Sequence, residues 1–200
     1  MVIIGITGGV GAGKSFILDH LEQQYGARIL RTDDVAKELY EPGQKLNQRL
    51  QEELPESCFL PDGNVNRPEL ARLIYQDPRI LEEVNALVHP MVMEAGLDAI
   101  ALARGEDVAY FVIESALLYD SDLNQLCDSK WYIYTSEEMR RNRLRETRGY
   151  SDEKITSIME NQLSEEEFRK KSDIVIDNNG TKMQGITQVD HAMERLEHGI

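Results

Sequence analysis

A glycine-rich stretch near the N-terminus carries the clearest chemical signal in this 200-residue chain. Residues 8–15 read GGVGAGKS, which fits the pattern G-x-x-x-x-G-K-[ST] of a phosphate-binding loop. Glycines let the backbone wrap closely, so that its N–H groups point at phosphate oxygens. Lys14 would reach the terminal phosphates and Ser15 would hold Mg²⁺. The stretch therefore predicts a site for a nucleotide phosphate.

The residues around the loop supply the local structure that such a loop needs. An apolar run over 2–6 predicts a strand before it, and a helical pattern of apolar residues begins at Phe16. The start of that helix adds a partial positive charge beside the loop. A dinucleotide-binding loop has the pattern G-x-G-x-x-G. It does not fit here, because its third glycine, counted from Gly11, would fall on Phe16.

Further strands alternate with helical patterns along the chain. They are predicted over 27–32, 108–114, 130–135 and 173–177. Such alternation indicates an α/β fold, a parallel sheet of five strands flanked by helices. We expect one domain over 1–200, with a P-loop NTPase-type core, a helical substrate-holding insertion and an arginine-rich lid. The expected bounds are about 1–43, 106–138 and 172–200 for the core, 44–105 for the insertion and 139–171 for the lid.

Positive charge is concentrated in one short predicted helix, although the net charge of the chain is −14. The helix carries Arg140, Arg141, Arg143, Arg145 and Arg148. Guanidinium forks match phosphate oxygens, and Arg141, Arg145 and Arg148 share one helical face. A break at 149–152, with Ser151 as a helix cap, would start a second helix. Two helices around a hinge predict a lid that closes over phosphates, with a solvated arginine face as the alternative.

Composition excludes several classes of protein. The acidic balance argues against non-specific nucleic-acid binding, which needs a basic surface. No apolar run approaches the ~18 residues of a membrane span, and no basic region precedes the first apolar stretch as in a signal peptide. Cys58 and Cys127 have no motif spacing, which is typical of free thiols in a reducing compartment. We expect a cytoplasmic protein with no membrane or nucleic-acid partner.

Asp33 is the best candidate for a general base. It follows the strand predicted over 27–32, and ligands of parallel sheets bind at the carboxyl ends of strands, so it should come near Lys14. Asp33 could also cap a helix over 34–41. The guanine-reading N-K-x-D stretch of GTPases is absent. The fold, insertion and lid together suggest a small-molecule kinase, whose acceptor hydroxyl benefits from a nearby carboxylate.

The order of these motifs resembles the dephospho-CoA kinase family from Ile4 to about Gly180. The matching residues are 6–15, Asp33, Ala36, 42–43, 62–63, Arg67, 87–90, 117–120, Arg143, Gln162 and 173–180. The resemblance implies ATP-dependent phosphorylation of the ribose 3′-hydroxyl of dephospho-CoA, the last step of coenzyme A biosynthesis. A kinase for another small acceptor, such as a nucleoside monophosphate, and a non-catalytic nucleotide-binding regulator stay as alternatives.

The resemblance also implies a role for individual residues. Lys14, Asp33 and Arg143 would be catalytic, with Asp33 as the base, Arg140 and Arg148 would belong to the lid, and the protein would be a monomer or a weak homo-oligomer. ATP would lie on Gly8, Gly9, Gly11, Ala12, Gly13, Lys14, Ser15 and Phe16. The acceptor would meet Asp33, Asp62, Arg67, His89, Pro90, Leu117 and Leu118. Taken alone, His89 before Pro90 in a helical run predicts a kink with a hydrogen-bonded imidazole.

The chain departs from the family pattern at four positions. Arg31 stands where the family usually has an acidic residue, so the role of the base falls on Asp33 alone. Phe16 replaces a common threonine and Ala116 replaces a usual proline. Arg148 lies one residue away from its usual spacing from Arg143.

Overall fold

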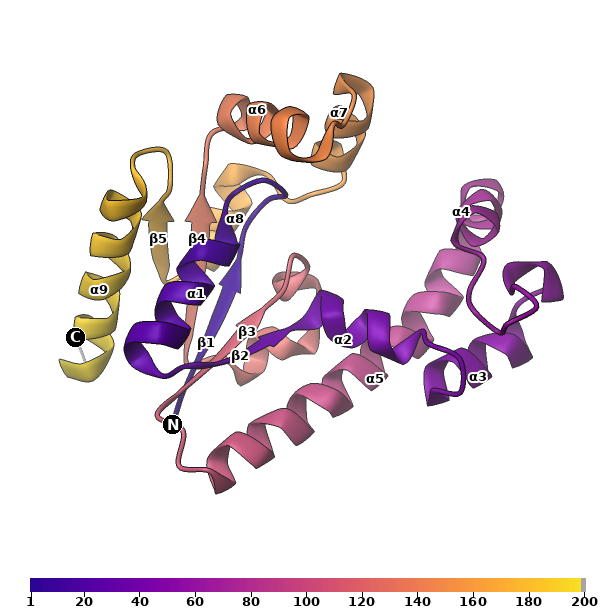
Figure 1. The fold of residues 1–200 in the computed structure, drawn as a ribbon, viewed down its shortest axis with the longest axis horizontal. Helices are drawn as coiled ribbons and strands as arrows, with labels where there is room; N and C mark the ends of the chain where they lie inside the picture. The colour runs from indigo at the N-terminus through magenta and orange to yellow at the C-terminus, as the bar shows by residue number, and fades with distance from the viewer. Residues whose placement is uncertain (199–200) are drawn as a thin grey trace. The chain divides into compact units, whose positions relative to one another are not determined.

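The structure, a computed structural model, describes residues 1–198 and divides into two compact units (Figure 1). The first unit joins Met1–Ile29 to the chain from Ala103 onward. The second unit is Leu30–Leu102, which begins earlier than the insertion predicted at about 44. The loop and the arginine-rich helix belong to the first unit, and Asp33 belongs to the second.

The chain forms a five-stranded parallel sheet, as predicted, and all of it except the last two residues of β2 belongs to the first unit. Its strands are β1 (Val2–Thr7), β2 (Arg28–Arg31), β3 (Tyr110–Glu114), β4 (Ser129–Tyr134) and β5 (Ile174–Asp177), in the order β2-β3-β1-β4-β5. The middle strand β1 pairs in parallel with β3 on one side and β4 on the other. The register sets Ile6 opposite Glu114, so the carboxylate that ends β3 lies beside the residues that lead into the loop.

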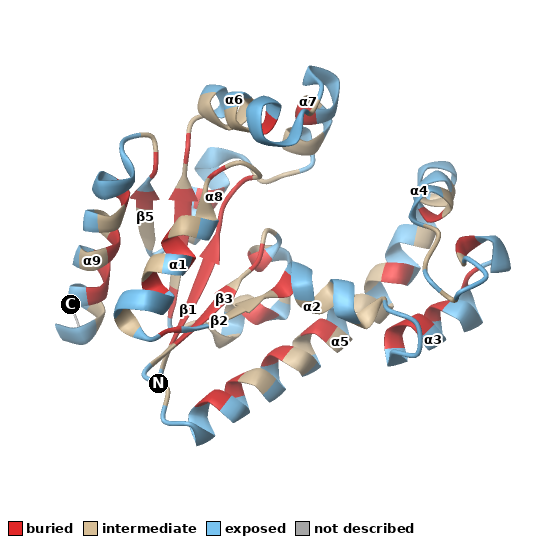
Figure 2. Ribbon diagram, in the orientation of Figure 1, coloured by how far each residue is buried: buried red, intermediate tan, exposed pale blue. Residues whose placement is uncertain are grey.

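Two helices cover one face of this sheet and bury its apolar side chains (Figures 1 and 2). They are α1 (Lys14–Tyr25) and α9 (Lys182–His198). Leu18 and Leu21 of α1 and Val189 of α9 pack with Trp131 and other strand residues, and all are at most 2% exposed. Helix α1 ends at Gly26, in the left-handed conformation with φ of 62° that glycine often adopts after a helix.

The opposite face is covered by shorter elements. The 3₁₀ segments η2 (Leu118–Asp120) and η3 (Asp122–Leu126) follow β3. Helix α8 (Glu165–Lys171) places Phe168 in a stacked contact with Tyr132, with ring centroids 4.7 Å apart.

Cys127 follows η3 and lies beside Gly5 of β1, where burial raises the pKa of its thiol to about 12. It is unpaired, as predicted, and so is the buried Cys58 of the second unit.

The arginine-rich region forms α6 (Glu137–Arg148) and α7 (Asp152–Glu160). Gly149 ends α6 in the left-handed conformation. Ser151 caps α7 by accepting a hydrogen bond from the backbone N–H of Lys154, as the sequence predicts.

The second unit is helical, as predicted for 44–105. It contains α2 (Thr32–Leu39), α3 (Lys45–Glu53), η1 (Glu56–Cys58), α4 (Arg67–Gln76) and most of α5 (Pro78–Gly105). The repeat of Leu46, Leu50 and Leu54 lies inside its core with Leu70 and Val84. Helix α5 begins at Pro78 and continues through Pro90.

The expectation that Asp33 caps a helix over 34–41 is wrong. Helix α2 begins at Thr32, directly after β2, so Arg31 takes the cap position. Asp33 lies in the first turn, where a carboxylate is favoured by the partial positive charge of the helix N-terminus.

By length and composition alone, α5 could cross a membrane, with a mean hydropathy of 1.4 in its apolar window. A single helix of this kind is weak evidence for a span, because the core helix of a soluble protein passes the same test. The absence of a membrane-spanning segment therefore stays a prediction.

Candidate active site

The loop over 8–15 connects β1 to α1 and turns sharply at two glycines. Gly11 and Gly13 both adopt a φ of 82°, which side-chain-bearing residues rarely do. Gly13 takes the cap position of α1, so the first N–H groups of the helix open toward the loop. Ser15 is exposed at the start of α1. The Phe16 ring lies beside α9, where a Cβ on Gly185 would be 3.2 Å from the ring.

Lys14 is held across the loop by two oxygen atoms of the first unit. Its Nζ donates to the carbonyl oxygen of Gly8 at 2.9 Å and lies 3.4 Å from Oε1 of Glu114. The side chains of Lys14 and Glu114 are only 14% and 13% exposed. Glu114 ends the strand predicted over 108–114, and the sequence analysis missed its contact with Lys14. A carboxylate at the end of a buried strand was the only signal available, since the sequence does not give the order of the strands.

Arg143 holds the backbone of the loop by hydrogen bonds to its carbonyl oxygens. Its Nη1 donates to the carbonyl oxygens of Gly11 at 3.3 Å and Ala12 at 3.2 Å, and its Nη2 donates to the carbonyl oxygen of Asn178 at 3.1 Å. Asn178 is 3% exposed and donates from Nδ2 to Ala12 O at 2.7 Å. Thr135 adds a third hydrogen bond to the same oxygen at 3.0 Å. Three buried or half-buried side chains thus fix the backbone of the loop.

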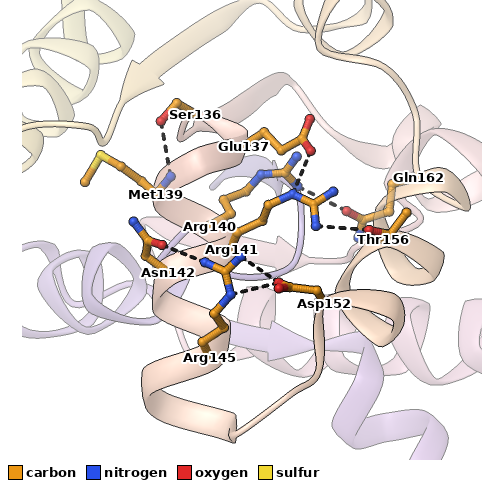
Figure 3. Close-up of polar contacts among 10 residues, drawn as sticks. All are labelled: Ser136, Glu137, Met139, Arg140, Arg141, Asn142, Arg145, Asp152, Thr156 and Gln162. Carbon is orange, nitrogen blue, oxygen red and sulfur yellow. Dashed lines mark hydrogen bonds and ion pairs between the residues drawn. The ribbon is translucent and has the colours of Figure 1, made fainter.

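Arg140 and Gln162 contact each other beside Gly9 and Val10 of the loop (Figure 3). Its Nη1 donates to Gln162 Oε1 at 3.3 Å, and the backbone N–H of Val10 donates to the same oxygen at 3.3 Å. A Cβ built on Gly9 would be 1.8 Å from Nη1 of Arg140. Gly9 is therefore needed for the close approach of the guanidinium group to the loop.

Arg141 and Arg145, which share one face of α6, make hydrogen bonds to α7 (Figure 3). Arg141 donates to Glu137 at 2.8 Å and to Thr156 of α7 at 3.0 Å, and Arg145 donates to Asp152 of α7 at 2.8 Å. The bonds to Thr156 and Asp152 tie α6 to α7. Arg148 is exposed, with its Cζ 5.9 Å from the centre of the Tyr150 ring.

A pocket of about 380 Å³ in the second unit brings Asp33 and Arg67 together. Asp33, Ala36, Lys37 and Tyr40 come from one face of α2, and Arg67 begins α4. The rest of the lining is apolar, from Val65, Leu70, Ala71 and Ile74. Burial raises the pKa of Tyr40 above its usual value. Sequence reasoning missed Lys37 and Tyr40, although their spacing of four and seven residues from Asp33 was the available signal.

The other predicted acceptor residues of the second unit do not line this pocket. Asp62 accepts a hydrogen bond from the backbone N–H of Asn64 at 3.0 Å, which lowers the pKa of its carboxyl. His89 and Pro90 are exposed on α5. Among residues 1–198, none shares a hydrogen bond with the His89 imidazole, so the expected hydrogen-bonded imidazole is wrong.

Leu117 and Leu118 differ in exposure. Leu117 is 53% exposed and is free to meet a ligand. Leu118 is fully buried and packs where a Cβ on Gly5 would be 2.8 Å from its Cδ2. Its predicted contact with a ligand is therefore corrected to a packing role. The prediction that Asp33 comes near Lys14 concerns residues of two units and stays a prediction.

Comparison with known proteins decides the family. Residues 2–184 match the sequence model of a family described as dephospho-CoA kinase. The chain belongs to the dephospho-CoA kinase family. The resemblance seen in the sequence is thereby confirmed, and the chain is a kinase, with ATP as the phosphate donor that its family implies.

Relatives of the dephospho-CoA kinase family match over nearly the whole chain. A dephospho-CoA kinase of Corynebacterium efficiens is 33% identical over 196 residues, which cover 98% of each chain. A solved structure from Thermus thermophilus is 25% identical with a TM-score of 0.79, over 100% of this chain and 97% of that one. The dephospho-CoA kinase of Campylobacter jejuni, 18% identical over 98% of each chain, has the same fold with a TM-score of 0.69.

Proposed function

We propose that the chain transfers the γ-phosphate of ATP to the ribose 3′-hydroxyl of dephospho-CoA, giving CoA and ADP in the last step of coenzyme A biosynthesis. The observation that carries the proposal is the family match over residues 2–184. We also propose that the enzyme works in the cytoplasm as a monomer or weak homo-oligomer, without a nucleic-acid or membrane partner.

The loop is the proposed donor site. Its N–H groups and Lys14 bind the phosphates of ATP, and the hydroxyl of Ser15 holds Mg²⁺ together with the nucleotide. Residues 1–198 contain no cluster of three or more His, Cys, Asp or Glu side chains that could hold a metal. This fits an ion bound mainly through phosphate oxygens and water. When bound, Mg²⁺ neutralises charge on the phosphates.

The two arginines of α6 that face the loop have different proposed roles. Arg143, for which the resemblance implied a catalytic role, donates to backbone carbonyl oxygens, so we propose instead that it fixes the shape of the loop. Arg140 presents its guanidinium group beside Gly9, where it can stabilise charge on the phosphate being transferred. Arg148 is exposed at the end of α6, and its proposed role stays that of a lid residue.

The pocket of the second unit is the proposed acceptor site. Asp33 accepts the proton of the 3′-hydroxyl, which is the role of a general base. Arg67 and Lys37 provide positive charge for the phosphates of the acceptor, and the apolar lining receives its uncharged parts. Asp62, His89, Pro90 and Leu117 are proposed to contact the acceptor outside this pocket.

Replacing Gly9 with alanine is expected to raise the KM for ATP by about 10- to 150-fold, because a displaced guanidinium loses a charge-assisted hydrogen bond of about 1.5–3 kcal/mol. The melting temperature should stay close to that of the wild type, since the clash falls on the flexible end of Arg140. Gly105→Ala is the matched control, because no atom lies within 4 Å of its added Cβ. ATP titrations that give the two variants the same KM would contradict the role of Arg140.

A panel of acceptors in an ADP-release assay tests the function itself. Dephospho-CoA should be turned over, and the product should gain one phosphate by mass. Turnover of AMP or CMP with none of dephospho-CoA would replace the proposal with a nucleoside monophosphate kinase. ATP binding without turnover of any acceptor would indicate a non-catalytic regulator, which Arg31 slightly favours.

A further inference from the structure

Gln162 connects the arginine-rich region to the loop. It lies in the connection between α7 and α8, and its side chain is half-buried. Its amide oxygen Oε1 accepts from two donors at 3.3 Å, the backbone N–H of Val10 and Nη1 of Arg140 (Figure 3). One neutral oxygen thus joins a loop amide to an arginine.

These two donors are of the types that bind phosphate in nucleotide-binding loops. Loop amides are aimed at phosphate oxygens, and guanidinium groups neutralise the charge on them. A neutral amide oxygen at 3.3 Å is a long and weak acceptor for such donors. Nε of Arg140 is buried and has no hydrogen-bond partner among residues 1–198. The guanidinium group is therefore held in place but incompletely satisfied.

We propose that Gln162 is a positioning residue whose amide oxygen stands in for an oxygen of the terminal phosphate of the nucleotide. It keeps Arg140 and the Val10 amide in the arrangement that the phosphate then takes over. This inference rests on the proposed function only in placing ATP on the loop, and it does not depend on the acceptor.

The exchange is favourable because the incoming acceptor is charged. A phosphate oxygen makes hydrogen bonds roughly twice as strong as those of a neutral acceptor. Gly9 leaves the room that the exchange needs, since a Cβ there would be 3.1 Å from Gln162 Oε1 and 1.8 Å from Nη1 of Arg140. The side chain of Gln162 is then released when ATP binds and returns when the phosphate leaves.

The variant Gln162→Glu tests the proposal by replacing the neutral amide with a negatively charged carboxylate. Its carboxylate would pair with Arg140 and oppose the terminal phosphate, so the Kd for ATP should rise about tenfold or more. The Kd for ADP, which has no terminal phosphate, should change by less than about threefold. Asn161→Asp is the matched control, because it adds the same charge at a side chain that bonds back to Ser157 of α7. Calorimetric titration with each nucleotide and Mg²⁺ measures these constants without any acceptor.

The variant Gln162→Ala separates a stand-in from a direct ligand. The phosphate then has no amide oxygen to displace, but Arg140 is no longer held in place before ATP binds. These two effects oppose each other, so the Kd for ATP should stay within about threefold of the wild-type value. A loss of ATP affinity as large as that of Gln162→Glu would show that Gln162 contacts the nucleotide, and the proposal would be wrong. Equal weakening of ATP and ADP by Gln162→Glu would also overturn it. Failure of the acceptor assignment would instead be seen only in the turnover assay.

Discussion

Replacing Asp33 with asparagine is expected to lower kcat by about 10²–10⁴-fold, the range typical of a lost general base. Asparagine has nearly the same shape as aspartate but cannot accept the hydroxyl proton. A group used mainly in the transition state contributes little to the binding of ATP. The Kd for ATP should therefore stay within about threefold of the wild-type value, and dephospho-CoA turnover with separate ATP titrations measures both.

Asp34→Asn is the matched control for this experiment. Asp34 is the next carboxylate of α2, is exposed and pairs with Lys37 at 2.6 Å. Both variants remove one negative charge from the first turn of the helix, so both lose the same favourable interaction with its N-terminus, about 0.3–1 kcal/mol. Near wild-type turnover in Asp33→Asn would refute the assignment of the base. Equal losses in the two variants would trace the effect to α2 as a whole.

Regular patterns in the sequence were sufficient to predict the fold. The strands show as apolar runs, and their alternation with helical patterns implies a parallel sheet. The ends of some helices can also be predicted, because the residues that end or cap a helix act through their own backbone or side chain. Gly26 ends α1 in a conformation that glycine adopts easily, and Ser151 caps α7 with its own hydroxyl.

The orientation of α6 could not be predicted from its arginines. Helical spacing shows which residues share a face, but the face that meets the loop depends on what lies across from it. Leu144 is the buried residue of α6, but Arg140 lies four residues before it and Arg148 four residues after it. Both spacings place an arginine beside this leucine, so the buried position does not separate the arginine that meets the loop from the one that does not.

Contacts that depend on sheet order were also beyond the sequence. Glu114 meets Lys14 because β3 lies beside β1, and nothing local to either strand specifies that neighbour. The misplaced cap at Asp33 has a different cause. A strand and a helix joined without an intervening loop residue leave no turn signal to mark where the helix begins.

Lys14→Met is expected to abolish nearly all turnover, by about 10³-fold or more, because the charge on the terminal phosphates loses a fixed cation. Unlike Asp33→Asn, it should also weaken ATP binding, by about tenfold or more, since the ammonium contacts phosphate in the ground state as well.

The variant Lys14→Met should also lower the stability of the folded protein. The Glu114 carboxylate, 13% exposed, loses the ammonium group 3.4 Å away. We expect this to lower the free energy of unfolding by about 1–3 kcal/mol.

The double variant Lys14→Met with Glu114→Gln separates these two effects. Neutralising Glu114 removes the uncompensated charge, so chemical denaturation should show most of the lost stability restored. Turnover should stay as low as in Lys14→Met, because the cation at the phosphates is still missing. The single variant Glu114→Gln should fold normally and keep ATP binding, since Lys14 retains its bond to the Gly8 carbonyl oxygen at 2.9 Å. If the double variant regained turnover, Lys14 would act only by balancing Glu114, and its assignment as a catalytic residue would fail.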